Sequence, residues 1–168
     1  ARSSLIEICK NDEITKSFWL FNDDFYILKP FDRTEPFHVG ELRDHIERVE
    51  ARHGNKRTNY TRHLRECESL LRSAVLTTLD YAIHVPLLVE RSTMLEALTV
   101  FPTCPMFRSL YGNYANIGGT QRKDVKINDA ATIPEADLDL LSSSDKSISS
   151  KISPVSATLF IIQLSLGV

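Results

Sequence analysis

Apolar residues recur at intervals of three and four between residues 37 and 53, which is the spacing of one face of an α-helix. Four of them form this stripe: Val39, Leu42, Ile46 and Val49. Pro36 lies near the expected first turn and Gly54 just beyond the expected end, where helix termini favour these two residue types. The pattern predicts a helix over residues 37–53.

A second helix is predicted over residues 58–83, because small and apolar residues again follow one face. The expected inner face consists of Leu64, Cys67, Leu71, Ala74, Val75, Thr78 and Ala82. Gly54 and Asn55 form only a short link between the two helices, so we expect an antiparallel helix hairpin.

Helices are also predicted before and after this hairpin. Asp12 suits the N-cap of a short helix that ends near Phe21. Pro86 opens or kinks a third helix that continues to Leu98. A brief helix followed by a loop is expected within residues 104–120.

The C-terminal part holds two further expected elements. Thr132 and Glu135 have the spacing of a capping box at the start of a short helix. Residues 155–166 are apolar on nearly every side of a helix, which predicts burial in the core or in an oligomer interface. Because Phe160 and Ile161 are also good strand formers, a strand is the alternative there.

These elements together predict an all-α fold. The chain has only six Gly and seven Pro in 168 residues, few for an all-β protein with frequent turns. Two small helical halves are expected, with a soft boundary near residues 85–88. Residues 1–85 hold the helix hairpin, and residues 86–168 form the C-terminal helical domain.

The first third of the chain is rich in aromatic residues. They are Phe18, Trp19, Phe21, Phe25, Tyr26, Phe31 and Phe37. Such rings also stack on nucleic-acid bases, but acidic neighbours such as Asp23 and Asp24 favour packing in a core. Self-association is expected through this aromatic region or through the apolar segment 155–166.

Composition excludes several classes of protein. A formal net charge of -2 gives no overall attraction to nucleic acid or to an anionic membrane, so any such binding requires a local patch. Cys9, Cys67 and Cys104 are widely spaced and odd in number, which favours reduced, buried thiols in a cytoplasmic protein. Neither a signal peptide nor a long apolar span is visible, so no membrane role is expected.

No catalytic or metal-binding motif is found. Phosphate-binding, zinc-protease and serine-hydrolase signatures are all absent from the sequence. His63 and Cys67 share a helix face, but no second pair completes a zinc site, so we expect no metal and no cofactor. The chain is therefore expected not to be an enzyme; the alternative is an unfamiliar helical enzyme with a cleft near Tyr111, Tyr114 and residues 118–119.

The unusual feature is a run without acidic residues between Ala51 and Arg65, which contains five Lys or Arg. On the expected second helix, Arg62 and Arg65 are three apart and Arg72 follows seven later, which gives one exposed stripe. Arginine suits phosphate because its planar fork donates two parallel hydrogen bonds. The predicted RNA-binding residues, each as a phosphate contact, are Arg48, Arg52, Lys56, Arg57, Arg62, Arg65 and Arg72.

Acidic residues lie on both sides of this run and support a second interpretation. They are Glu47, Glu50, Glu66 and Glu68. If they neutralise the arginines, the surface is an ordinary salt-bridged one, and the protein is a helical scaffold for protein–protein interaction with no nucleic-acid role.

The stretch from Thr58 to Arg72, TNYTRHLRECESLLR, together with the chain length and the helical pattern in two halves, resembles the RNA-silencing suppressors of closteroviruses, of the beet yellows virus type. The resemblance implies a non-enzymatic viral protein in the cytoplasm of an infected host cell. It also implies a ring-shaped homo-oligomer, an octamer, that binds RNA, including small duplexes, without sequence specificity along a basic inner surface.

Overall fold

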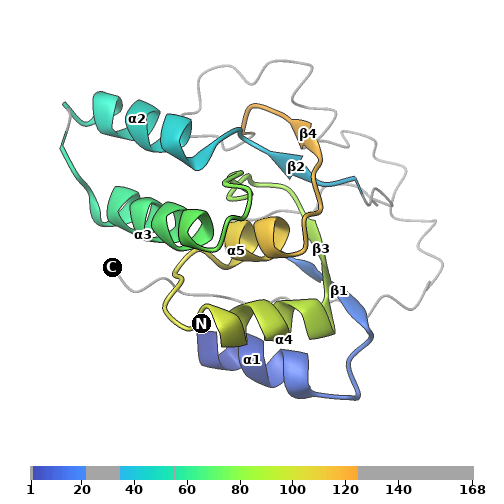
Figure 1. Cartoon of the computed structure of the whole chain (residues 1–168). Helices are drawn as coiled ribbons and strands as arrows, with labels where there is room; N and C mark the ends of the chain where they lie inside the picture. Colours follow the sequence, from blue (N-terminus) through green and yellow to red (C-terminus); the bar gives the residue numbers. More distant parts are fainter. Residues whose placement is uncertain (1, 22–34, 55, 125–168) are drawn as a thin grey trace, which may run out of the picture.

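The computed structural model describes residues 2–21, 35–54 and 56–124 of the chain (Figure 1). Within these ranges the elements are α1 (Arg2–Lys10), β1 (Ser17–Leu20), β2 (Phe37–His38), α2 (Leu42–Arg52), α3 (Asn59–Ser73), β3 (Leu87–Glu90), α4 (Arg91–Val100), α5 (Phe107–Tyr114) and β4 (Thr120–Gln121). The helices expected near Thr132 and over residues 155–166 lie outside the described residues, as do Phe25, Tyr26 and Phe31.

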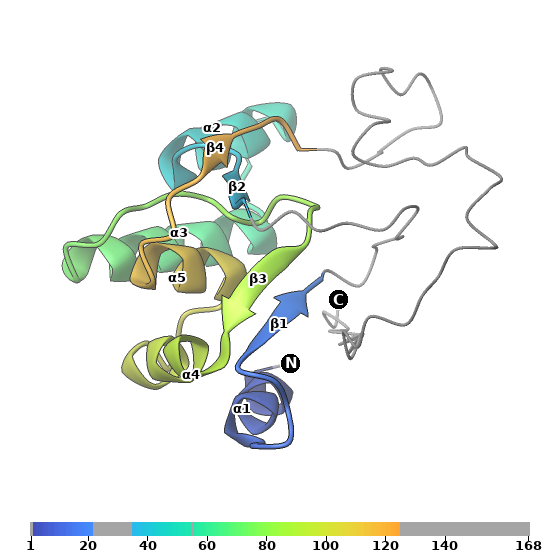
Figure 2. The same ribbon diagram turned by 90° about the vertical axis from the view of Figure 1, so that its right-hand side faces the viewer.

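The prediction of an all-α fold is wrong, because the strands form two small sheets. Strand β1 pairs antiparallel with β3, with Ser17 opposite Glu90 and Leu20 opposite Leu87. Strand β2 pairs parallel with β4. Figure 2 shows β1 and β3 lying side by side.

Strand β1 replaces the helix expected over residues 12–21. Its residues alternate between the two faces, with Phe18 and Leu20 buried and Ser17 exposed. The side chain of Asn11 accepts a hydrogen bond from the backbone N–H of Glu13, which forms a turn after α1 instead of a helix start. Pairing with β3, about seventy residues away in sequence, therefore decides the structure here.

Strand β3 likewise replaces the beginning of the helix expected from Pro86. Leu87 and Val89 are buried and alternate with half-buried neighbours, which is a strand pattern. Helix α4 begins only after Glu90, whose carboxylate accepts hydrogen bonds from the backbone N–H groups of Ser92 and Thr93.

The two helices of the predicted hairpin are present, but both are shorter than expected. Helix α2 begins at Leu42 because Phe37 pairs with β4. Thr58 and Thr61 form a reciprocal capping box at the start of α3. Helix α3 ends at Ser73, and Val75 takes a left-handed conformation with φ 58° and is 92% exposed, so its expected inward position is wrong.

A buried arginine accounts for the irregular backbone that follows α3. Arg108 on α5 donates hydrogen bonds to four backbone carbonyls: Leu20 at 2.9 Å, Tyr81 at 2.9 Å, Ile83 at 3.1 Å and Val85 at 2.5 Å. A helix through this segment would use the carbonyls of Tyr81, Ile83 and Val85 in its own backbone hydrogen bonds. Burial lowers the pKa of Arg108 to about 10, so the guanidinium stays charged at neutral pH.

Asp80 is the buried carboxylate beside this arginine. It accepts a hydrogen bond from Ser109 on α5 at 2.9 Å and pairs with His45 on α2. Its backbone also bonds to Val39 and Gly40. Asp80 therefore joins α2, α5 and the segment between α3 and β3.

The helices pack in the order α2, α3, α5, α4 and α1 (Figure 1). The main core cluster includes Leu5, Leu64 and Leu71 from one side of residue 85 and Met94 and Leu110 from the other. The division into domains at residue 85 stays a prediction, since much of the second part lies outside the described residues.

Arg108→Lys is expected to lower the free energy of unfolding by about 2–4 kcal/mol, because one ammonium does not reach four carbonyls and leaves buried acceptors unpaired. Urea unfolding measures the change. Arg72→Lys, on the exposed face of α3, is the matched control and should change stability by less than about 0.5 kcal/mol. If the two variants unfold at the same urea concentration, Arg108 does not have this stabilising role.

The N-cap of α4, Glu90, is expected to make a contribution to the free energy of unfolding that depends on pH. Hydrogen bonds from Thr93 and Ser92 lower the pKa of Glu90 from 4.5 to about 2. Because the folded pKa is the lower one, the stabilisation is present above pH 4.5 and is lost as the pH falls towards 2. Glu90→Gln should therefore cost about 1 kcal/mol at neutral pH and almost nothing near pH 2.

This is measured by urea unfolding of both proteins across that pH range, with exposed Glu7→Gln on α1 as the control. A difference between wild type and Glu90→Gln that is independent of pH would show that the cap is not the cause.

Candidate nucleic-acid interface

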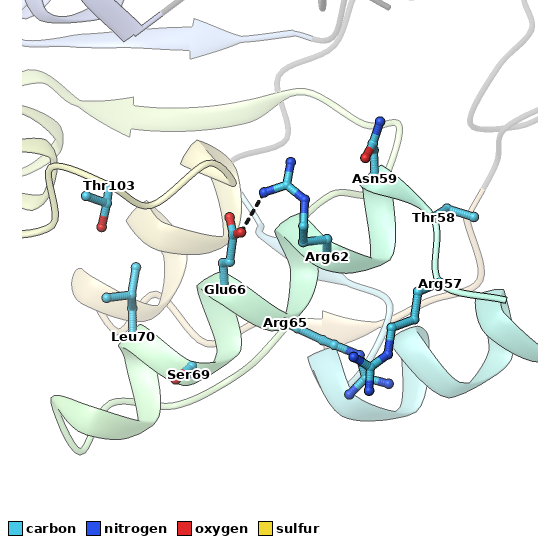
Figure 3. Close-up of a pocket in the computed structure, with 9 residues that line it drawn as sticks. All are labelled: Arg57, Thr58, Asn59, Arg62, Arg65, Glu66, Ser69, Leu70 and Thr103. Carbon is cyan, nitrogen blue, oxygen red and sulfur yellow. Dashed lines mark hydrogen bonds and ion pairs between the residues drawn. The ribbon is translucent and has the colours of Figure 1, made fainter. Parts of the chain in front are cut away.

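The outer face of α3 forms a groove with a volume of about 620 Å³ (Figure 3). Its lining residues come from the link before α3, from α3 itself and from the link between α4 and α5. They are Arg57, Thr58, Asn59, Arg62, Arg65, Glu66, Ser69, Leu70 and Thr103.

Helix periodicity explains why these residues share a face. Arg62, Arg65 and Ser69 follow at intervals of three and four, whereas Leu64 and Cys67 lie on the opposite, buried face. The capping box at Thr58 fixes the start of α3, so Arg57 precedes its first turn directly. Among the described residues that line the groove, the only cations are arginines.

The seven predicted RNA-binding residues are all exposed, but the structure does not bring all of them together. Arg57, Arg62 and Arg65 line the groove. The other four lie outside it: Arg48 and Arg52 on α2, Lys56 on the link and Arg72 near the end of α3.

Three of the arginines have carboxylate partners. Arg62 pairs with Glu66 at 2.7 Å, and Arg72 pairs with Glu68 at 2.9 Å, both within α3. Arg65 crosses to α2 and binds Glu50 with two hydrogen bonds, of 3.2 and 2.7 Å. These three side chains therefore belong to a salt-bridged surface, as the second interpretation of the sequence expected.

The other cations lie around the α2–α3 link. In the ranges that the structure describes, no carboxylate pairs with Arg52, Lys56 or Arg57. Arg48 donates a hydrogen bond to the carbonyl of Val39 at 3.3 Å. Among the predicted RNA-binding residues, those that lack both a carboxylate partner and a side-chain hydrogen bond within the described ranges therefore lie at the link and at the adjoining end of α2.

The Glu50–Arg65 pair is ionised on both sides. The hydrogen bond from Arg65 lowers the pKa of Glu50, with smaller contributions from Thr61 and from the charge of Arg57. The same hydrogen bond raises the pKa of Arg65. Two guanidinium charges, on Arg57 and Arg65, therefore act on one carboxylate.

The residues considered for metal binding point in different directions. Cys67 is buried in the core, and hydrogen bonding with Cys104 together with burial raises the pKa of its thiol. His63 instead contacts the guanidinium of Arg62 at 3.1 Å. Among the described residues, no three His, Cys, Asp or Glu side chains gather as metal ligands would.

The tyrosines of the enzyme alternative are used in packing. The hydroxyl of Tyr111 accepts a hydrogen bond from the backbone of Glu90 at 2.9 Å. The ring of Tyr114 packs edge-on against that of Phe101, with 6.1 Å between the ring centroids. The carbonyl of Gly118 accepts from the hydroxyl of Tyr81 at 2.8 Å.

The sequence interpretation missed two features of this site. Thr103 enters the groove lining from the α4–α5 link, and nothing in the local pattern indicates this position. Glu50 was recognised only as one of several neighbouring acids, although it holds Arg65 from another helix.

Comparisons with known proteins find no match: no family model, no curated protein and no solved structure is similar to this chain. The resemblance to closterovirus suppressors stays a prediction. None of the described helices has the length and apolar character needed to span a membrane.

Proposed function

We propose that the protein binds RNA without sequence specificity through phosphate contacts around the α2–α3 link and the α3 groove. The role that follows from the resemblance is suppression of RNA silencing in the cytoplasm of an infected cell. In that role a ring-shaped homo-oligomer sequesters small RNA duplexes.

The observation that carries this proposal is the set of exposed cations without carboxylate partners. Arg52, Lys56 and Arg57 are exposed within the described part of the chain, and Arg57 opens onto a groove that also contains Arg62 and Arg65. Phosphate contacts of this kind carry no base specificity.

The paired arginines contribute less to this proposal than the unpaired ones. Arg62 and Arg72 already have carboxylate partners in α3, and RNA must displace these partners to use them. Exposed ion pairs of this kind are weak, at about 0–1 kcal/mol, so a phosphate chain is able to compete with them.

Substitution of the unpaired cations is the first test. Arg52→Gln, Lys56→Gln and Arg57→Gln together should weaken RNA binding and flatten its salt dependence. Three lost phosphate contacts reduce the slope of log affinity against log salt by about 3. Between 50 and 200 mM salt, wild type should therefore lose about 40-fold more affinity than the triple variant. Fluorescence anisotropy with single-stranded and duplex RNA measures this.

The matched control replaces three exposed cations elsewhere, Lys10, Lys16 and Arg43, with Gln. It makes the same change in net charge away from the link and should keep the wild-type slope. Wild-type binding that is absent, or flat across the salt range, would remove the proposal. Light scattering on the same samples measures the mass of the assembly.

A protein-interaction scaffold is the second candidate, and Val75 is the observation in its favour. This apolar side chain is 92% exposed and occupies a left-handed position that glycine normally takes. A protein partner whose capture survives nuclease and high salt, and is lost in Val75→Gly, would favour this role over RNA binding.

A further inference from the structure

The two hydrogen bonds between Arg65 and Glu50 leave part of the guanidinium available. Arg65 uses Nε and Nη2 to bind the two carboxylate oxygens of Glu50. A guanidinium has five N–H groups, so the edge formed by Nη1 and the second Nη2 hydrogen remains. No described residue accepts a hydrogen bond from Nη1 of Arg65.

Glu50 holds this arginine from a fixed position. Its side chain is only 15% exposed and belongs to α2, whereas Arg65 belongs to α3 and is 42% exposed. Because Glu50 and Arg65 lie on two helices that pack against each other, the ion pair fixes the direction of the guanidinium relative to α2 and α3.

Arg62 is held in a different way. Its partner Glu66 is one turn away on the same helix, and both side chains are about half exposed, at 57% and 43%. Its other terminal nitrogen contacts His63. Both terminal nitrogens of Arg62 therefore have a contact, whereas Nη1 of Arg65 has none among the described residues.

Arg57 supplies a second cation at the same end of the groove. Figure 3 shows the side chains of Arg57 and Arg65 directed to the same side of α3, and both line the groove. Glu50 is the carboxylate that interacts with both charges. These three groups carry a net charge of +1, which suits an oxyanion. Glu68 and Glu47 act on Arg65 more weakly than Glu50 does.

We propose that Arg57 and Arg65 form a phosphate-binding subsite and that Glu50 is the positioning residue for Arg65. This inference rests on the proposed RNA-binding function, and it names backbone phosphate as the occupant. The open edge of Arg65 donates two parallel hydrogen bonds to phosphate oxygens, and Arg57 adds charge beside it.

The proposal makes a prediction opposite to that of simple charge counting. Glu50→Gln removes a negative charge near the groove, so long-range electrostatics alone would strengthen RNA binding. If Glu50 positions Arg65, the same substitution weakens binding about tenfold and reduces the salt slope by about 1, because one phosphate contact is lost.

Glu47→Gln is the matched control, since it removes the same charge from an exposed position on the same helix, and the charge of Glu47 also acts on Arg65. It leaves Glu50 and Arg65 intact and should bind RNA as tightly as wild type or more tightly. Anisotropy titrations of wild type, Glu50→Gln, Glu47→Gln, Arg65→Gln and the double variant Glu50→Gln/Arg65→Gln complete the experiment. In the Arg65→Gln background, loss of Glu50 should have no further weakening effect.

Circular dichroism confirms that each variant is folded, and Glu50→Asp, which keeps the charge on a shorter side chain, replaces Glu50→Gln if that variant unfolds. RNA binding that is retained, with Glu50→Gln as tight as Glu47→Gln, overturns the subsite and leaves the proposed function standing. Wild type that fails to bind RNA overturns both.

Discussion

One buried guanidinium, on Arg108, determines how most of the described chain is arranged. It bonds to carbonyls at the end of β1 and in the segment before β3, and it does so from α5. A charge in this position requires a compensating charge, which Asp80 provides from the same core. Asp80 in turn pairs with His45, so the position of α2 depends on the same buried network. The direction of Arg65 in the groove depends on the position of α2 as well, since its partner Glu50 is on that helix.

Local periodicity was sufficient to predict some elements and misleading for others. The stripes of α2 and α3 extend over three or more turns, and the brief helix near Tyr111 is also present, as α5. Strands β1 and β3 have four residues each, and neither is stable without its partner far away in sequence. Helix α3 ends earlier than predicted, and the carbonyls of Tyr81, Ile83 and Val85 bond to Arg108 instead of to a helix backbone. No local pattern identifies that arginine as buried.

The candidate site shows the same division between local and long-range information. That Arg62 and Arg65 share an outer face follows from helix geometry and was expected. The pairing of Arg62 with Glu66 also follows from a spacing of four residues. The pairing of Arg65 with Glu50 joins residues fifteen apart on two helices and depends on how these helices pack. Sequence therefore indicates the basic surface, whereas the tertiary structure decides which of its charges are neutralised.

The double attachment of α2 limits how the groove is able to change shape. His45 is bound to a fully buried carboxylate, and Glu50, five residues later on the same helix, is bound to an arginine at the surface. A helix of this length bends little, so α2 does not slide along α3 at one attachment without disturbing the other. The two attachments consequently set the distance between the backbone positions that carry the cations of α2 and those of α3. An extended ligand therefore meets helices whose relative position is fixed, while the exposed side chains on them adjust to it.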